Sequence, residues 1–157
     1  MIITEATIDK ILDQLEADEA YQETLTARFE TMYEEYVSYL NQEIITLLSE
    51  EEGDLLHFVH AILLEAFLRA DDSLKIFEMD DFYDAEESMW SSYEDNIKAP
   101  FRDRITSVFD ASDEEDALAF IEDTLVDPEE GEEFQLSATG RDVIWNVCAA
   151  FVTVLAA

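Results

Sequence analysis

The segment from Leu55 to Leu68, LLHFVHAILLEAFL, is apolar on almost every face of the helix that its pattern predicts. A helix of that kind is stable in water only when other elements surround it. The chain has only three Gly and two Pro in 157 residues, which is few for a turn-rich β protein. We therefore predict an all-α fold: a single-domain bundle of about five to seven helices, with a central apolar helix near 55–68 and residues 1–157 as one domain.

Most of the other segments carry apolar residues at helical spacing and acidic residues on the opposite side. The apolar run from Val143 to Leu155 predicts a final helix that packs on the central one. The interval from Val126 to Gln135 has the composition of a loop. The helices predicted besides the central one cover about 4–18, 19–48, 82–97, 101–109, 117–125 and 137–155.

The charge is extreme for a folded domain. Forty Asp and Glu stand against eight Lys and Arg, a formal net charge of −32, whereas a net charge of magnitude about 2–8 keeps a small domain soluble. Excess charge of one sign repels itself and costs stability. Acids are spread evenly along the chain, and aromatic residues make up 11% of it, unlike a disordered acidic tail. Such a charge on a folded body indicates selection by something other than folding.

The density of this charge approaches that of duplex DNA. DNA has one negative charge per 1.7 Å, so 32 charges correspond to about 54 Å of duplex, while a domain of this size is roughly 40 Å across. Carboxylates at positions i and i+4 of a helix lie about 6 Å apart, comparable to successive phosphates. In acidity and helix content the chain is similar to the DNA-mimic proteins of phages and plasmids. The resemblance implies an inhibitor that occupies the nucleic-acid groove of a DNA-binding protein or nuclease.

Two groups of acids are expected to contact such a partner. We name the first group, on the outer stripes of the first two predicted helices, the predicted acidic face; it comprises Glu5, Asp9, Asp13, Glu16, Glu23, Glu30 and Glu34. The second acidic cluster comprises Asp80, Asp81, Asp84, Glu86 and Glu87. It is interleaved with Phe77, Phe82, Tyr83, Trp90 and Tyr93, which are expected to be mostly core; exposed members would form a protein-binding surface.

Two other functions remain open at this stage. One is an acidic helical chaperone or immunity-type module that binds a basic protein other than a DNA-binding one. The other is a halophile-adapted protein of unrelated function, whose charge serves solvation in brine. The expected partner is a basic protein, with a homodimer possible and neither direct nucleic-acid binding nor a membrane. The single Cys148, the absence of a secretory signal and the lack of a long apolar run favour the cytoplasm.

No motif for catalysis or for a cofactor stands out. His57 and His60 are three residues apart, but di-metal carboxylate bundles repeat a Glu-x-x-His motif on two helices and this chain has only two His. The sequence leaves open whether this pair binds a metal. The acidic run from Asp110 lacks the Gly and Glu that an EF-hand loop requires. We therefore expect a binding protein with no catalytic residue, no metal and no cofactor.

Overall fold

The computed structural model describes residues 2–95, 97–126 and 136–157. These residues form eight α-helices, one more than the upper end of the expected range, and no strand. The predicted loop from Val126 to Gln135 lies, beyond Val126, outside the described residues. The helices are α1 (Glu5–Ala17), α2 (Glu19–Met32), α3 (Glu34–Tyr39), α4 (Glu50–Ala70), α5 (Met79–Glu94), α6 (Phe101–Asp110), α7 (Glu115–Val126) and α8 (Ala138–Ala156).

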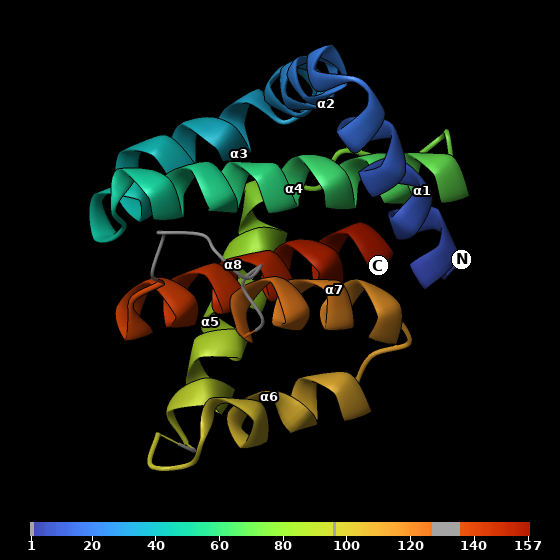
Figure 1. The fold of residues 1–157 in the computed structure, drawn as a ribbon. Coiled ribbons are helices and arrows are strands. Elements are labelled where there is room, and N and C mark those ends of the chain that lie inside the picture. Colours follow the sequence, from blue (N-terminus) through green and yellow to red (C-terminus); the bar gives the residue numbers. More distant parts are fainter. Residues whose placement is uncertain (1, 96, 127–135) are drawn as a thin grey trace.

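Two long helices, α4 and α8, form the centre of the bundle. They pack against each other, with α1 and α2 against α4, and with α7 and α5 against α8 (Figure 1). In this view α5 crosses behind α8 at a steep angle and leads to α6 at the bottom of the molecule. The predicted central apolar helix is therefore confirmed as part of α4, and α8 shares its role.

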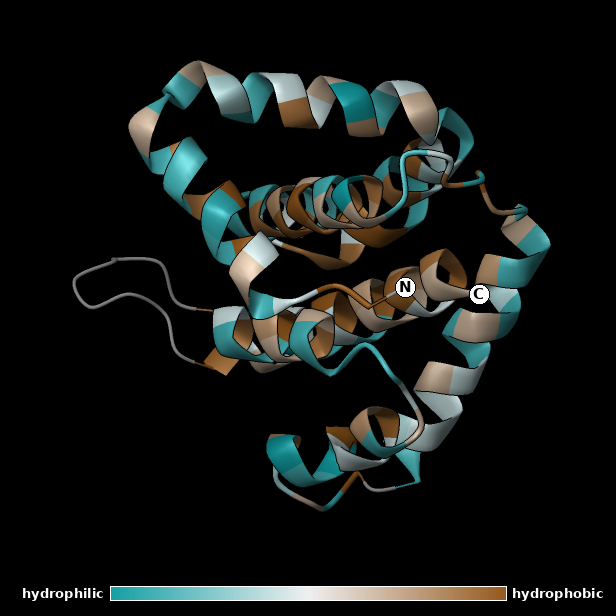
Figure 2. Cartoon of the chain, turned by 90° about the vertical axis from the view of Figure 1, so that its right-hand side faces the viewer, coloured by the Kyte–Doolittle hydropathy of each residue, from teal (hydrophilic) through white to brown (hydrophobic). Residues whose placement is uncertain are grey.

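The hydropathy of the chain follows this arrangement. Brown, apolar residues gather on the helices inside the bundle, and teal, polar residues lie on the outer sides (Figure 2). Nine consecutive residues of α4, from Val59 to Phe67, are buried, as are ten of α8, from Val143 to Val152. By length and composition alone α8 could also cross a membrane, but 67% of that segment is buried inside the protein, as expected of a core helix.

The two central helices begin at one shared carboxylate. Ser49 and Glu52 form a capping box at the start of α4, where Glu52 Oε1 accepts the backbone N–H of Ser49 at 3.0 Å. Glu52 Oε2 also accepts the backbone N–H and the hydroxyl of Ser137, at 2.9 and 2.7 Å, at the start of α8. Burial acts to raise the pKa of Glu52, but these hydrogen bonds outweigh it and lower the pKa.

The sequence prediction of one long helix over 19–48 is wrong. The helix is interrupted at Tyr33 (φ −120°, ψ 44°). The segment after α3 continues as a π-helical turn, Leu40–Ile44, and then a 3₁₀ turn, Ile45–Leu47. Buried side chains lie on both sides of the break, at Leu25 and Phe29 in α2 and at Tyr36 and Val37 in α3. The helical period does not account for the break, because residues at i, i+4 and i+8 share one face of an unbroken helix.

A second buried carboxylate ties three helices together. Glu65 of α4 accepts Arg69 Nε at 3.0 Å and the Tyr21 hydroxyl at 3.3 Å, and it is also bonded to Arg28 of α2. Arg69 in turn donates to Gln14 of α1. Two of the five arginines thus pair with one buried acid.

Candidate functional site

The first part of the predicted acidic face forms a straight row on α1. Glu5, Asp9, Asp13 and Glu16 are all exposed, while Ile8 and Ile11 on the other side are buried. Steps of four, four and three residues give a row about 16 Å long with a charge every 5–6 Å or so. The row is anchored at its start, because Asp116 of α7 accepts the backbone N–H of Glu5 at 2.9 Å. The spacing of the carboxylates in this row is comparable to that of successive phosphates along a DNA strand.

The rest of the predicted face does not continue this row. Asp18 caps α2, and the chain turns there, so Glu23 and Glu30 follow a different axis from α1 (Figure 1). Glu34 lies beyond the break at Tyr33, on α3. All three are exposed. The structure thus distributes the seven residues over three helix axes.

The second acidic cluster lies on α5 and divides into two sides. Asp80, Asp81, Asp84 and Glu87 are exposed, whereas Glu86 is half-buried. The Tyr39 hydroxyl of α3 donates to Glu86 Oε1 at 2.8 Å, and Glu86 Oε2 has no partner. Burial raises the pKa of Glu86, against the lowering effect of the Tyr39 bond. Glu86 therefore belongs to the contact between α3 and α5 and not to an outward surface.

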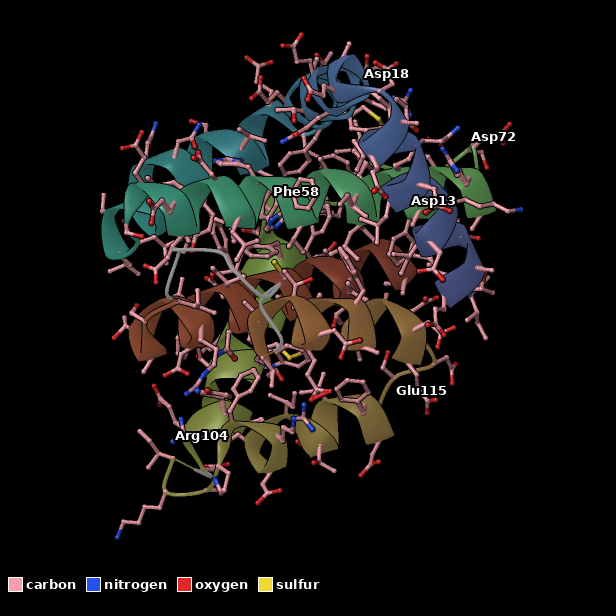
Figure 3. All side chains as sticks on the ribbon, viewed as in Figure 1. Asp13, Asp18, Phe58, Asp72, Arg104 and Glu115 are labelled. Carbon is pink, nitrogen blue, oxygen red and sulfur yellow. The ribbon has the colours of Figure 1, made fainter. Side chains whose placement is uncertain are left out.

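The exposed carboxylates are not neutralised by the protein's own cations. The described residues contain three ion pairs, and their acids are Glu65, which is buried, and Asp142, which is half-buried. All but seven of the acids in the described ranges are exposed. Red carboxylate oxygens accordingly project outward all around the molecule, including at Asp18, Asp72 and Glu115 (Figure 3). The exposed carboxylates of the described residues therefore face solvent without an ion-pair partner.

Local rows matter more than the average charge. Spreading −32 over the accessible surface of 8989 Å² gives one charge per about 280 Å², a mean spacing of about 17 Å, which is twice the Debye length of about 8 Å at physiological salt. Charges at that spacing act almost independently. Only helical stripes such as the α1 row bring carboxylates close enough to act together on one partner groove.

A cavity of about 720 Å³ lies where the connector between α4 and α5 runs beside α2 and α3. We call it the tyrosine pocket. Phe77 of the connector packs on Tyr33 and Tyr36, with ring centroids 5.0 and 5.3 Å apart. Ile76 and Tyr83, which also line the pocket, are 59% and 43% exposed. The remaining lining residues are Thr31, Met32, Glu34, Glu35, Ser38, Tyr39, Gln42, Glu43 and Met79.

Most of the predicted aromatic cluster is core, as expected. Phe82 and Tyr93 are buried, and Phe77 and Trp90 are half-buried. Tyr83 is the exposed member. The tyrosines of α3 and of the break before it, Tyr33, Tyr36 and Tyr39, were not singled out from the sequence. Their three-residue spacing is ordinary core spacing, and only the approach of the connector makes it a pocket.

The buried histidine and cysteine do not form an activated pair. His60 Nδ1 lies 2.7 Å from the Leu56 carbonyl, which can only accept, so Nδ1 carries the proton and Nε2 accepts the Tyr36 hydroxyl at 2.8 Å. Cys148 Sγ is 3.8 Å from that protonated nitrogen and has no base there. Burial lowers the pKa of His60 to about 3 and raises that of the Cys148 thiol.

The two histidines do not share a ligand position. His57 is half-buried and its Nε2 lies 3.1 Å from Asn41 Oδ1, whereas His60 is enclosed by the aromatic core. Within the described ranges no three His, Cys, Asp or Glu residues are grouped closely enough to hold a metal ion.

No protein-family model matches the sequence, and comparisons with curated proteins and with solved structures find no significant match.

Proposed function

We propose that this protein is a non-enzymatic binding protein, a DNA mimic that occupies the nucleic-acid groove of a DNA-binding protein or nuclease. The observation that carries the proposal is the uncompensated surface: the exposed carboxylates of the described residues are outside every ion pair, and those of α1 follow one straight row. A basic groove built for phosphates would find the same charge at a similar spacing, on a body that it does not have to bend.

Rigidity supports this reading. The α1 row sits on a helix whose N-terminus is bonded to α7 and whose other end is joined to Arg69 through Gln14. Preorganised charges bind without the entropy cost of being ordered, whereas a flexible acidic tail must be ordered when it binds. Because the interaction would be spread over many carboxylates, replacing one should reduce affinity only slightly, and the losses should accumulate as more are replaced.

The test is affinity capture from the protein's own cells at low salt, followed by elution with duplex DNA. We expect nucleic-acid-binding proteins in the eluate, and we expect polyglutamate at equal charge to release them less well. A variant with Asp9→Asn and Asp13→Asn should capture less of the same proteins. Partners that remain bound in excess duplex DNA would contradict the proposal.

The tyrosine pocket favours a second candidate, an acidic helical chaperone or immunity-type module for a basic protein. A phosphate mimic needs charges but no aromatic cavity, whereas recognition of a particular protein commonly uses a pocket with aromatic walls. This candidate predicts a basic partner whose binding is insensitive to DNA. Elution with duplex DNA therefore distinguishes the two candidate functions.

A further inference from the structure

We infer that the tyrosine pocket receives an arginine side chain of the basic partner. The inference rests on the proposed function in one respect, that the partner is basic. It adds a defined contact to an interaction that would otherwise be spread over the whole surface. The aromatic walls of the pocket and the charge at its rim favour this side chain.

The walls of the pocket favour a cation. Five of the lining residues are aromatic, and aromatic faces attract a cation placed within about 6 Å of the ring centre. Glu34, Glu35 and Glu43 supply negative charge and are exposed, and the lining contains no Lys or Arg. An anionic ligand would meet repulsion here, and a purely apolar one would leave the carboxylates desolvated without a partner.

The tyrosine hydroxyls below the pocket are not open to a ligand. Tyr36 donates to His60 and Tyr39 donates to Glu86, so both of these hydroxyls are used within the fold. Tyr33 is only 2% exposed, and its hydroxyl oxygen is buried without a partner. The aromatic walls and the rim carboxylates are therefore the groups that select a ligand.

Arginine fits these features better than lysine does. The guanidinium is planar, stacks on aromatic rings, is weakly hydrated and carries five N–H donors. It can therefore lie on an aromatic ring of the pocket and donate to a rim carboxylate at once. The lysine ammonium is compact and strongly hydrated, and it would lose more water for fewer contacts.

The probe is N-acetyl-arginine-methylamide, added to the labelled protein at low salt and followed by NMR. We expect shifts concentrated at Ile76, Met79 and Tyr83, at least threefold weaker binding of the lysine analogue, and no saturable binding of the neutral citrulline analogue. Shifts spread evenly over all acidic helices, or equal binding of the three compounds, would overturn the inference.

Three variants make the test specific. Glu35→Gln deletes one rim charge and should weaken arginine binding about threefold to tenfold. Tyr33→Phe deletes only a buried hydroxyl that the ligand does not reach and should leave binding within about twofold. Glu23→Gln makes the same charge change on α2 at a residue outside the pocket lining and should leave binding within about twofold. Because Tyr33→Phe removes an unpartnered group, it should fold at least as stably as the parent, and Glu35→Gln changes an exposed residue. Unchanged binding by Glu35→Gln would refute the pocket.

The two proposals fail separately. If arginine binds in the pocket but captured partners ignore duplex DNA, the DNA mimic fails and the pocket stands. If DNA releases the partners but arginine shows no preference for the pocket, the pocket fails and the mimic stands.

Discussion

Substituting alanine for Gly140 tests whether one carboxylate holds the starts of both central helices. A Cβ at Gly140 would lie 2.1 Å from Glu52 Oε2 and 2.8 Å from Oε1, so the whole carboxylate must move. Alanine favours a helix by up to about 1 kcal/mol over glycine, and on propensity alone the change would stabilise α8. We expect the opposite sign.

The magnitude follows from the bonds that move with the carboxylate. Glu52 is 4% exposed and accepts three hydrogen bonds, two of them from Ser137. Hydrogen bonds to a charged group contribute about 1.5–3 kcal/mol each, so losing the two from Ser137 and gaining helix propensity leaves a net loss of about 2–5 kcal/mol. For a protein of this length that lowers Tm by roughly 4–20 °C.

The assay is urea unfolding followed by circular dichroism, with Gly53→Ala as the matched control. There the new Cβ would meet only the end of the Ile45 side chain, at 3.0 Å, so the change should be neutral or stabilising by up to about 1 kcal/mol. In a Glu52→Ala background, Gly140→Ala should also become neutral or stabilising, because no carboxylate remains to be displaced. Destabilisation by Gly140→Ala that persists in that background would refute the reasoning.

Three further outcomes follow from the described contacts. Glu65→Gln leaves Arg28 and Arg69 without their carboxylate and should lower the free energy of unfolding by about 2–4 kcal/mol, whereas the exposed Glu23→Gln should stay within about 0.5 kcal/mol; equal effects in urea unfolding would contradict this role. The imidazole ¹⁵N shifts of His60 should remain those of the neutral Nδ1–H form well below pH 6.5, because its folded pKa is about 3. Between about pH 6.5 and pH 3 only the unfolded state binds a proton on His60, so this histidine lowers the free energy of unfolding as pH falls through that range. Titration of His60 near pH 6 in the folded protein would contradict its burial as a neutral imidazole. A sharp thermal transition in dilute buffer is expected, shifted upward by added NaCl as the carboxylates are screened; failure to fold without salt would favour halophilic adaptation.

Periodicity predicts the helices and the exposed stripes because burial and charge alternate with the helical period along the chain. The break at Tyr33 has no such signal, because Leu25, Phe29 and Tyr33, at steps of four residues, would also share one face of an unbroken helix. The contact between Glu52 and Ser137 has none, since 85 residues separate the two. The tyrosine pocket is equally hidden, because it depends on how the connector through Phe77 runs beside α3.

The predicted acidic face is less continuous in the structure than its helical pattern in the sequence indicates. Glu5 to Glu16 form one row as expected, but the turn at Asp18 and the break at Tyr33 place the later residues on other axes. Glu86 faces Tyr39 because the α3–α5 contact closes over it. Local pattern predicts which side of each helix carries charge, whereas the angles between helices depend on packing between distant segments.

The most direct test of the central claim is an equilibrium competition between this protein and duplex DNA for one purified target. The account predicts mutually exclusive binding: the apparent Kd rises linearly with the concentration of free DNA and without a plateau, and affinity falls steeply as salt rises. Replacing the four acids of the α1 row, Glu5, Asp9, Asp13 and Glu16, by their amides should weaken binding far more than any one replacement. A ternary complex of this protein, its target and DNA would contradict the account.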